Sequence, residues 1–239
     1  MKEGKMDTQI AKSAHPTVFQ ELISGTLPTS EKETLRLQDE AQLVVAAGVT
    51  TTGWALSVAA FHLLSNPPVL ARLQEELSSA IPDPSAPLSW TDLEKLPYLT
   101  GCVREAVRMS YAVTTRNPRL FSKPMTYKDW VIPPRTPISM TIVDVNDDEE
   151  IFPNAREFRP QRWINSPKTK DGSSLERYFV GFGKGTRSCL GIKSVLPLMF
   201  LASSFTVLID RTNFLLQPCP CRTIHDTRSC LSQFQFPTL

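Results

Sequence analysis

No excess of charge of one sign marks this chain. Its 239 residues carry 26 lysines and arginines against 24 aspartates and glutamates, a formal net charge of +2. A nucleic-acid-binding protein usually gathers its basic residues into a patch or stripe, so this balance argues against a nucleic-acid partner. Hydrophobic residues make up 41% of the chain, which is enough for a sizeable core in one large or two small domains.

Cysteine and histidine are scarce. An odd number of cysteines without regular spacing gives no disulfide framework and favours a reducing compartment. Three of the five cysteines crowd the last 21 residues. Together with one histidine they form a C-x-C-x3-H-x4-C pattern, which is tighter than the usual zinc spacing and leaves a zinc site as an alternative. These four residues are Cys219, Cys221, His225 and Cys230.

The chain shows no signal peptide or membrane anchor at its start, because residues 1–16, MKEGKMDTQIAKSAHP, are polar. The one candidate span is SVLPLMFLASSFTVLI, residues 194–209. It is shorter than the roughly 20 residues that a bilayer needs, and Pro197 interrupts it. We expect a buried helix there, with a membrane-associated segment as the alternative.

Four segments in the first half are predicted to be helical. Residues 30–64 form a long helix with Ser30 as its cap, and the second half of this helix, apolar nearly all round, is expected to be buried. An Asn-Pro pair ends it and starts the next helix, residues 68–81. Residues 89–96 suit a capped helical turn, and residues 96–110 a helix with one apolar side. That side carries Leu99, Cys102, Val103, Ala106 and Met109.

The second half changes character. Residues 112–143 are short β-branched and aromatic pieces separated by prolines, which predict small strands and hairpins. Residues 144–179 are charged and weakly periodic, and so long an irregular stretch in a compact domain is often functional.

A glycine-rich turn, FGKGTRSCLG at residues 182–191, holds one cysteine before an apolar run. A phosphate-binding loop would read G-x-x-x-x-G-K-[ST], and Tyr178 and Gly185 break that pattern. A cysteine nucleophile needs a histidine base, and no histidine stands in an obvious strand–loop context. Cys189 has no cysteine or histidine within 25 residues for a zinc site. What remains is a lone thiolate ligand, and one axial thiolate suits haem.

The turn resembles the haem-binding signature of the cytochrome P450 family, F-x-x-G-x-R-x-C-x-G, through Phe182, Gly185, Arg187, Cys189 and Gly191. The resemblance implies that Cys189 is the axial ligand of the haem iron. The glycines let the backbone approach the porphyrin, and N–H groups after the cysteine tune its sulfur. Phe182 then shields the sulfur, and Arg187 pairs with a haem propionate.

Three further stretches follow the family's order. EAVR matches E-x-x-R and places Glu105 and Arg108 one helical turn apart. FRPQRW, residues 158–163, resembles the segment whose arginine, here Arg162, joins that pair in a buried triad. AAGVTTT, residues 46–52, resembles the oxygen-binding groove of the family's long central helix. By resemblance Thr50 and Thr51 are the catalytic residues there, and Arg119 is a second propionate partner.

The resemblance covers residues 14–192 and is closest to fungal members. It implies a mainly α fold with small β-sheets, similar to the C-terminal half of a cytochrome P450. It divides the chain into a partial family domain, residues 1–192, and a divergent C-terminal helix and tail, residues 193–239. The implied function is haem-dependent monooxygenation of a small, apolar organic substrate, in fungal secondary metabolism. NADPH supplies the electrons through a reductase that docks near Lys184, Lys193 and Arg104.

Departures from the family pattern keep other interpretations open. Thr50 stands where relatives use an acid for proton delivery, and the family's N-terminal half has no counterpart here. The pattern also fades after Ile192. A truncated, catalytically inactive remnant is therefore the first alternative, and a small metal-binding interaction protein that uses the Cys/His tail is the second. The family implies the endoplasmic reticulum membrane surface, whereas this chain, with no N-terminal anchor, is expected in the cytoplasm if it is stable alone.

Overall fold

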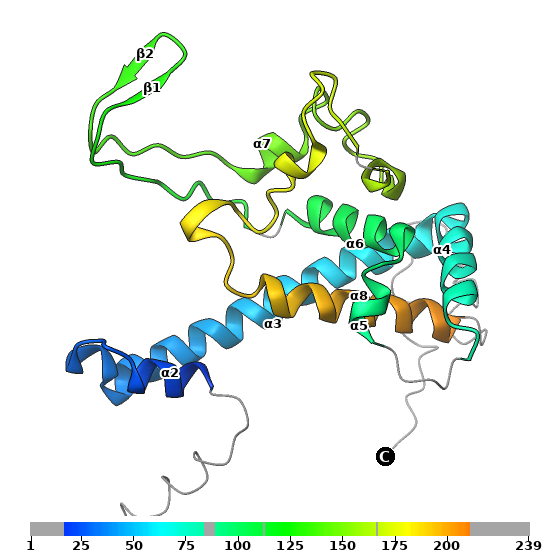
Figure 1. Cartoon of the computed structure of the whole chain (residues 1–239), viewed down its shortest axis with the longest axis horizontal. Helices are drawn as coiled ribbons and strands as arrows, with labels where there is room; N and C mark the ends of the chain where they lie inside the picture. The colour runs from blue at the N-terminus through cyan, green and yellow to red at the C-terminus, as the bar shows by residue number, and fades with distance from the viewer. Residues whose placement is uncertain (1–16, 84–88, 112, 166, 211–239) are drawn as a thin grey trace, which may run out of the picture. The chain divides into compact units, whose positions relative to one another are not determined.

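The computed structural model describes residues 17–83, 89–111, 113–165 and 167–210, and it divides the chain into two compact units, residues 1–50 and 51–239. The first unit contains helix α2 (Val18–Ser24), a 3-10 helix (Thr29–Lys32) and the start of helix α3 (Thr34–Ser65). The rest of α3 and all later elements belong to the second unit (Figure 1). The described chain is mainly helical with one small sheet, which confirms the predicted fold class.

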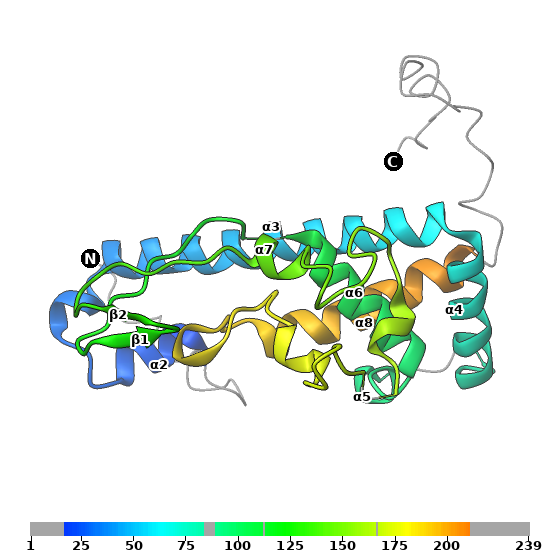
Figure 2. The same cartoon turned by 90° about the horizontal axis from the view of Figure 1, so that it is seen from above.

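Helices dominate the second unit, where α4, α5, α6 and α8 lie together in both views (Figures 1 and 2). Three 3-10 helices interrupt the irregular segments between α7 and α8, at residues 160–163, 175–178 and 185–187. The helices of this unit are α4 (Pro67–Ala80), α5 (Trp90–Leu93), α6 (Pro97–Ser110), α7 (Ile142–Asn146) and α8 (Ile192–Asp210).

The predicted cap of the long helix is wrong. Ser30 lies inside the 3-10 helix Thr29–Lys32, so a helical turn has already formed and ended before α3 begins at Thr34. A capping box forms earlier, at α2. There the Thr17 hydroxyl accepts a hydrogen bond from the Gln20 backbone N–H at 3.2 Å, and the Gln20 side chain accepts one from the Thr17 N–H.

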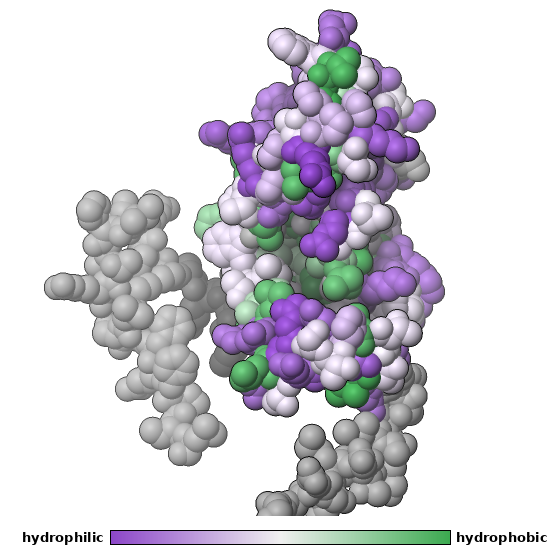
Figure 3. Space-filling model, turned by 90° about the vertical axis from the view of Figure 1, so that its left-hand side faces the viewer, coloured by the Kyte–Doolittle hydropathy of each residue, from purple (hydrophilic) through white to green (hydrophobic). Residues whose placement is uncertain are grey.

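The expected burial of the second half of α3 is also wrong for this chain. Only one line of side chains, spaced three and four residues apart, is buried. Trp54 and Phe61, which lie outside that line, are 56% and 66% exposed, although the Trp54 indole N–H donates to the Ser110 carbonyl at 2.6 Å. On the face of the molecule drawn in Figure 3, apolar residues lie between hydrophilic ones. The buried line consists of Thr52, Ala55, Ala59 and Leu63.

The segment with the length and composition of a membrane span differs from the predicted one. Among the described residues, α3 alone passes that test, with a mean hydropathy of 1.6. Within α8, the stretch Ile192–Ser204 is apolar but shorter than such a span. Core helices of soluble proteins share this length and composition.

The Asn-Pro pair separates two helices as predicted. Helix α3 ends at Ser65, and α4 begins at Pro67. The Asn66 side-chain amide donates to the His62 carbonyl at 2.6 Å, so it satisfies a carbonyl at the end of α3 and does not cap α4.

The main core lies where α6 packs against α4, α8 and the 3-10 turn at residues 160–163. Leu73 and Leu77 of α4, Leu99 of α6 and Met199 of α8 are fully buried. A smaller cluster around Phe152 lies beside it. As a result, ten of the fourteen residues of α6 are buried. The predicted apolar side of α6 is confirmed: Leu99, Cys102, Val103 and Ala106 are buried, and Met109 is half-buried.

The predicted small strands are confirmed. Strands β1 (Met125–Tyr127) and β2 (Trp130–Ile132) pair antiparallel, with Met125 opposite Ile132. An isolated antiparallel β-bridge joins Arg119, which precedes β1, to Ile138, which follows β2. The short helix α7 was not predicted, because its five residues are too few to show a helical period.

Candidate functional site

The carboxylate of Glu105 is the centre of a buried charged network. Arg108, one turn further along α6, donates to both of its oxygens, at 3.0 and 2.9 Å. Arg162, from the 3-10 turn, donates to Oε1 at 2.9 Å. The Trp163 indole N–H reaches Oε2 at 2.8 Å, and the backbone N–H of Arg159 reaches Oε1 at 3.1 Å. The structure thus brings together the three residues of the predicted triad.

Both arginines also bind backbone carbonyls. Arg108 donates to the carbonyls of Asn146 at 2.7 Å and Ala155 at 2.6 Å, and its guanidinium lies over the Phe152 ring. Arg162 reaches the carbonyls of residues 153 and 154 at 3.1 and 3.2 Å. Burial lowers the pKa of Arg162, and the nearby Glu105 carboxylate opposes that shift. The network therefore joins α6 to the irregular segment 146–163 through charge-assisted hydrogen bonds.

Two residues of this network were not predicted, Trp163 and Asn146. Trp163 lay inside the quoted FRPQRW segment, but nothing in that pattern shows where its N–H points. The amide of Asn146 donates to the Arg108 carbonyl at 2.8 Å, while its buried side-chain oxygen has no hydrogen-bond partner in the described residues. No sequence signal identified Asn146, because it ends a helix, α7, that is too short to detect.

A row of aromatic rings links the network to the glycine-rich turn. The Trp163 ring meets Phe179 edge-on at 5.5 Å between centroids, and Phe179 meets Phe182 edge-on at 6.0 Å. Next to these rings, a Cβ placed on Gly181 would lie 2.5 Å from Val107 of α6. The start of the turn is therefore packed closely on α6, and a side chain larger than hydrogen has no room there.

The turn itself, residues 182–191, changes from packed to exposed along its length. Gly183 and Gly185 have φ angles of +70° and +76°, which L-residues with a side chain rarely adopt. The Cys189 backbone N–H donates to the Phe182 carbonyl at 2.8 Å and closes the turn. The Cys189 thiol is free and exposed, and Leu190 beside it is 100% exposed.

The remaining predicted residues lie in separate places. Arg187 is exposed in the 3-10 turn at residues 185–187, and Gly191 precedes α8. Arg119 lies on the bridge to Ile138, and within the described residues its guanidinium reaches only the carbonyls of residues 117 and 118. Thr50 and Thr51 fall on α3 at the boundary of the two units. The tail proposed for zinc lies outside the described residues.

The turn suits a large, flat ligand bound through one sulfur. No group of three or more histidine, cysteine, aspartate or glutamate side chains in residues 17–83, 89–111, 113–165 or 167–210 could hold a metal ion alone. Nothing lies within 4 Å of a Cβ placed on Gly185, and Arg187 offers a cation on the same turn. A lone exposed thiol, an open backbone surface and an adjacent guanidinium together fit haem, which takes an axial thiolate ligand and binds cationic partners through its anionic propionates.

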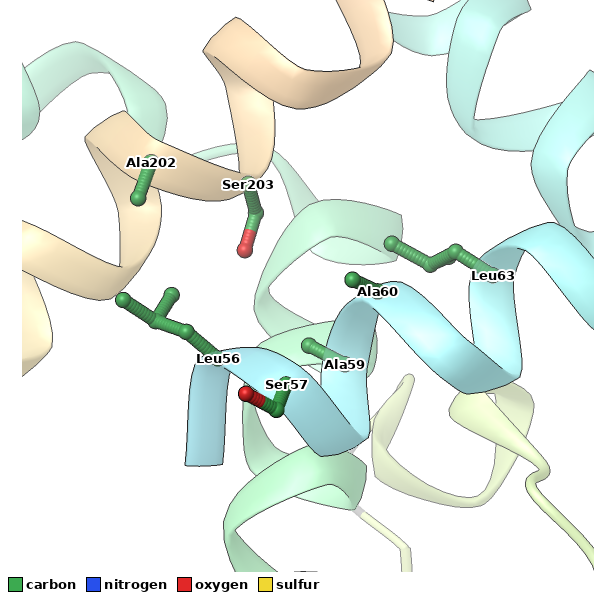
Figure 4. A pocket seen from close by; sticks show the side chains of 7 residues that line it. All are labelled: Leu56, Ser57, Ala59, Ala60, Leu63, Ala202 and Ser203. Carbon is green, nitrogen blue, oxygen red and sulfur yellow. The ribbon is translucent and has the colours of Figure 1, made fainter. Parts of the chain in front are cut away.

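A pocket away from the glycine-rich turn has few polar groups that could bind a ligand. It has a volume of about 270 Å³ and lies between α3 and α8 (Figure 4). Its only side-chain polar groups are two serine hydroxyls, and it has no titratable residue. The lining consists of Leu56, Ser57, Ala59, Ala60, Leu63, Ala202 and Ser203.

Known proteins of fungi are similar to this chain over most of its length. A cytochrome P450 monooxygenase (sdnE) of Sordaria araneosa is 48% identical over 205 residues, which are 85% of this chain and 39% of that protein. A cytochrome P450 monooxygenase (tpcC) of Cochliobolus heterostrophus is 44% identical over 192 residues, 77% of this chain and 35% of that protein. The chain therefore spans well under half the length of these curated relatives.

The fold agrees with a solved structure. The crystal structure of a cytochrome P450 (CYP102L1) superposes with a TM-score of 0.65 at 19% identity, covering 81% of this chain and 43% of that one. The family model described as Cytochrome P450 matches residues 1–227. The match confirms the family inferred from the glycine-rich turn and the E-x-x-R pair: the chain belongs to the cytochrome P450 family.

Proposed function

We propose that this chain forms the haem-binding part of a fungal monooxygenase, with the Cys189 thiolate as the axial ligand of the iron. The observation that carries the proposal is the free, exposed Cys189 thiol on a glycine turn closed by the Cys189–Phe182 backbone hydrogen bond. Family membership supports it, since the relatives named above are monooxygenases. When bound, the haem supplies the dioxygen activation that monooxygenation requires.

The chain's own residues have distinct roles in this proposal. Cys189 donates electron density through its sulfur, and the exposed guanidiniums of Arg187 and Arg119 neutralise the propionates. Phe182 keeps water from the sulfur side. The Thr51 hydroxyl holds or passes a proton on α3, and Thr50 takes the position at which relatives carry an acid.

The proposed partners and cellular location follow from family membership. The proposed electron source is NADPH through a reductase, and the proposed substrate is a small, apolar organic molecule. The proposed site of action is the surface of the endoplasmic reticulum membrane. Among the three cations considered for reductase docking, Arg104 is partly occupied, because it forms an ion pair with Glu176 and lies over the Phe179 ring. Lys193, with no such partner among the described residues, is the better candidate.

The exposed apolar surface of α3 favours a second proposal, that residues 1–239 do not hold haem productively on their own. Within the second unit, Trp54 and Phe61 are more than half exposed and Leu64 is 40% exposed. A soluble monomer tolerates an apolar patch of only a few hundred Å². On this proposal the chain aggregates or binds haem poorly unless further protein surface covers α3.

One expression experiment separates the two proposals. Residues 1–239 are expressed with a haem precursor, purified by size exclusion, and assayed for haem content and for NADPH-dependent oxygenated product with a fungal reductase. The second proposal predicts an aggregated or haem-poor chain without turnover. A monodisperse, haem-loaded chain that forms product would contradict it and support a minimal enzyme. A soluble, folded chain that excludes haem would support the second proposal. It would count against the first proposal only if added protein surface over α3 did not restore haem binding.

A further inference from the structure

A second pocket, at the C-terminal end of α6, has a volume of about 450 Å³, which is within the usual range for small-molecule sites. None of its lining residues belongs to the glycine-rich turn 182–191, to the Glu105 network or to α3. Its walls combine apolar and charged side chains. The lining consists of Met109, Tyr111, Thr114, Val143, Asp147 and Arg156.

The negatively charged side chain of the pocket, Asp147, is held by a hydrogen bond within the chain. The Tyr111 hydroxyl donates a hydrogen bond to Oδ1 of Asp147. Burial raises the pKa of Tyr111 to about 12, so the phenol stays protonated and remains a donor at neutral pH. In the described residues the second oxygen of Asp147, Oδ2, has no hydrogen-bond or ion-pair partner. The carboxylate is therefore held in place by one oxygen while the other remains able to accept.

The positively charged side chain of the pocket, Arg156, has no hydrogen-bond or ion-pair partner among the described residues. Arg156 is exposed. Asp147 and Arg156 thus line one pocket with opposite charges, yet they are not paired with each other at the 4.0 Å limit of an ion pair. Two opposite charges that are held apart match a ligand that carries both signs on separate groups.

Tyr111 itself has an unusual backbone. It ends α6 in the left-handed region, with φ at 47°, which a tyrosine rarely adopts. Strain of this kind persists only where the surroundings enforce it, and it gathers at binding sites. Here the conformation places the phenol against Asp147, while the half-buried side chains of Met109 and Val143 provide an apolar wall.

We propose that this pocket binds a small zwitterion with an apolar body, which is the chemistry of a hydrophobic α-amino acid. The ligand's ammonium group donates to Oδ2 of Asp147, and its carboxylate accepts from the guanidinium of Arg156. Its side chain lies against Met109 and Val143. The inference does not depend on haem binding or on turnover.

Three probes test each contact separately. L-leucine carries both charges, 4-methylpentanoate lacks the ammonium group, and L-leucinamide lacks the carboxylate. The complete chain, fused to a soluble carrier protein, is titrated with each probe and followed by saturation-transfer NMR, with the carrier alone as the blank. L-leucine should bind saturably, with a Kd of roughly 1 mM or tighter. Because a hydrogen bond to a charged group is lost with each, the other two probes should bind about tenfold more weakly.

Two variants and a control complete the experiment. Arg156→Gln should weaken L-leucine about tenfold and leave L-leucinamide unchanged. Asp147→Asn, which keeps an acceptor for Tyr111, should weaken L-leucine similarly and leave 4-methylpentanoate unchanged. Arg159→Gln removes an exposed arginine that does not line the pocket and should change nothing. Absence of saturable L-leucine binding to a chain with folded near-UV circular dichroism would overturn the proposal. So would an Arg156→Gln variant that binds L-leucine as tightly as the parent chain.

Discussion

Glu105 and Cys189 belong to two of the sequence motifs that carry the family resemblance, yet their surroundings differ. Glu105 is 0% exposed, and five hydrogen bonds from Arg108, Arg162, Trp163 and the backbone of Arg159 converge on its carboxylate. Cys189 is exposed, and its turn is held mainly by backbone hydrogen bonds. The carboxylate of the first motif is hydrogen-bonded by groups of the chain itself, whereas the thiol of the second motif is exposed.

Because the two surroundings differ, substitutions in the two motifs should have different effects. The Glu105 network joins α6 to residues 146–163, so its loss should affect the stability of the whole second unit. The turn at residues 182–191 contributes little buried surface at its distal end, so changes there should affect ligand binding more than folding. Each variant below tests one side of this contrast.

Glu105→Ala should have the largest effect on stability. It leaves two buried guanidiniums without their carboxylate, and breaking a buried charged network by removing one partner costs about 3–5 kcal/mol. Chemical denaturation followed by tryptophan fluorescence measures the loss. Asp92→Ala is the matched control, because it breaks the exposed Asp92–Lys95 pair and should cost less than about 1 kcal/mol. Equal small losses in both variants would mean that the Glu105 network does not stabilise the fold.

Gly101→Ala should have the next largest effect. A Cβ on Gly101 would lie 2.6 Å from the Pro160 carbonyl oxygen, so the backbone of the 3-10 turn must move away from α6. Such overpacking costs about 1–3 kcal/mol. The same denaturation experiment applies, and an unchanged midpoint would show that the contact between α6 and residues 160–163 is loose.

Gly185→Ala should cost less, about 1 kcal/mol. Its φ of +76° is unfavourable for alanine, but nothing lies within 4 Å of the added Cβ. Gly53→Ala, at an open helical position of α3, should instead stabilise the chain by about 0.5–1 kcal/mol. The opposite signs of the two changes are the diagnostic result, and a loss at Gly185 as large as that at Gly101 would show the turn to be rigidly packed.

The pH dependence of stability should show a small contribution from His62. The ring of His62 stacks on Phe158 at 4.9 Å, and burial lowers its pKa from the ordinary value, with Arg108 lowering and Glu105 raising it. The unfolded chain therefore binds the proton more readily, so stability is lost as the pH falls through about 6.5. His62→Phe keeps the stacking and should flatten the melting temperature between pH 7.5 and 5.5. An identical pH profile in both proteins would contradict this assignment.

Part of the fold could be predicted from the sequence because its signals are local. The period of α6, the Asn-Pro pair and the proline-separated strands follow from neighbouring residues, and the spacing of Glu105 and Arg108 indicated a shared helix face. The exposed sides of α3 could not be predicted in this way. An apolar helix indicates burial, but what covers it depends on distant parts of the chain.

The site was predictable to the extent that it rests on motif spacing. The spacing of the glycines and Cys189 predicted the turn. The family resemblance predicted that Arg162 joins Glu105 and Arg108 on α6. Asn146 and the pocket beside Tyr111 were missed, since they depend on a five-residue helix and on a backbone conformation that no sequence pattern records. Both features depend on how the elements pack together, which sequence patterns do not record.

The most direct test of the account is the identity of the iron ligand. The chain, loaded with haem together with whatever protein surface it needs, is reduced and exposed to carbon monoxide, and the difference spectrum is recorded for the parent chain, Cys189→Ala and Cys102→Ala. Cys102 is the control, because its thiol is buried in α6. Ligation of the iron by Cys189 predicts the absorption band typical of thiolate ligation in the parent chain and in Cys102→Ala, and its complete loss in Cys189→Ala. A thiolate band that survives in Cys189→Ala would contradict the central claim.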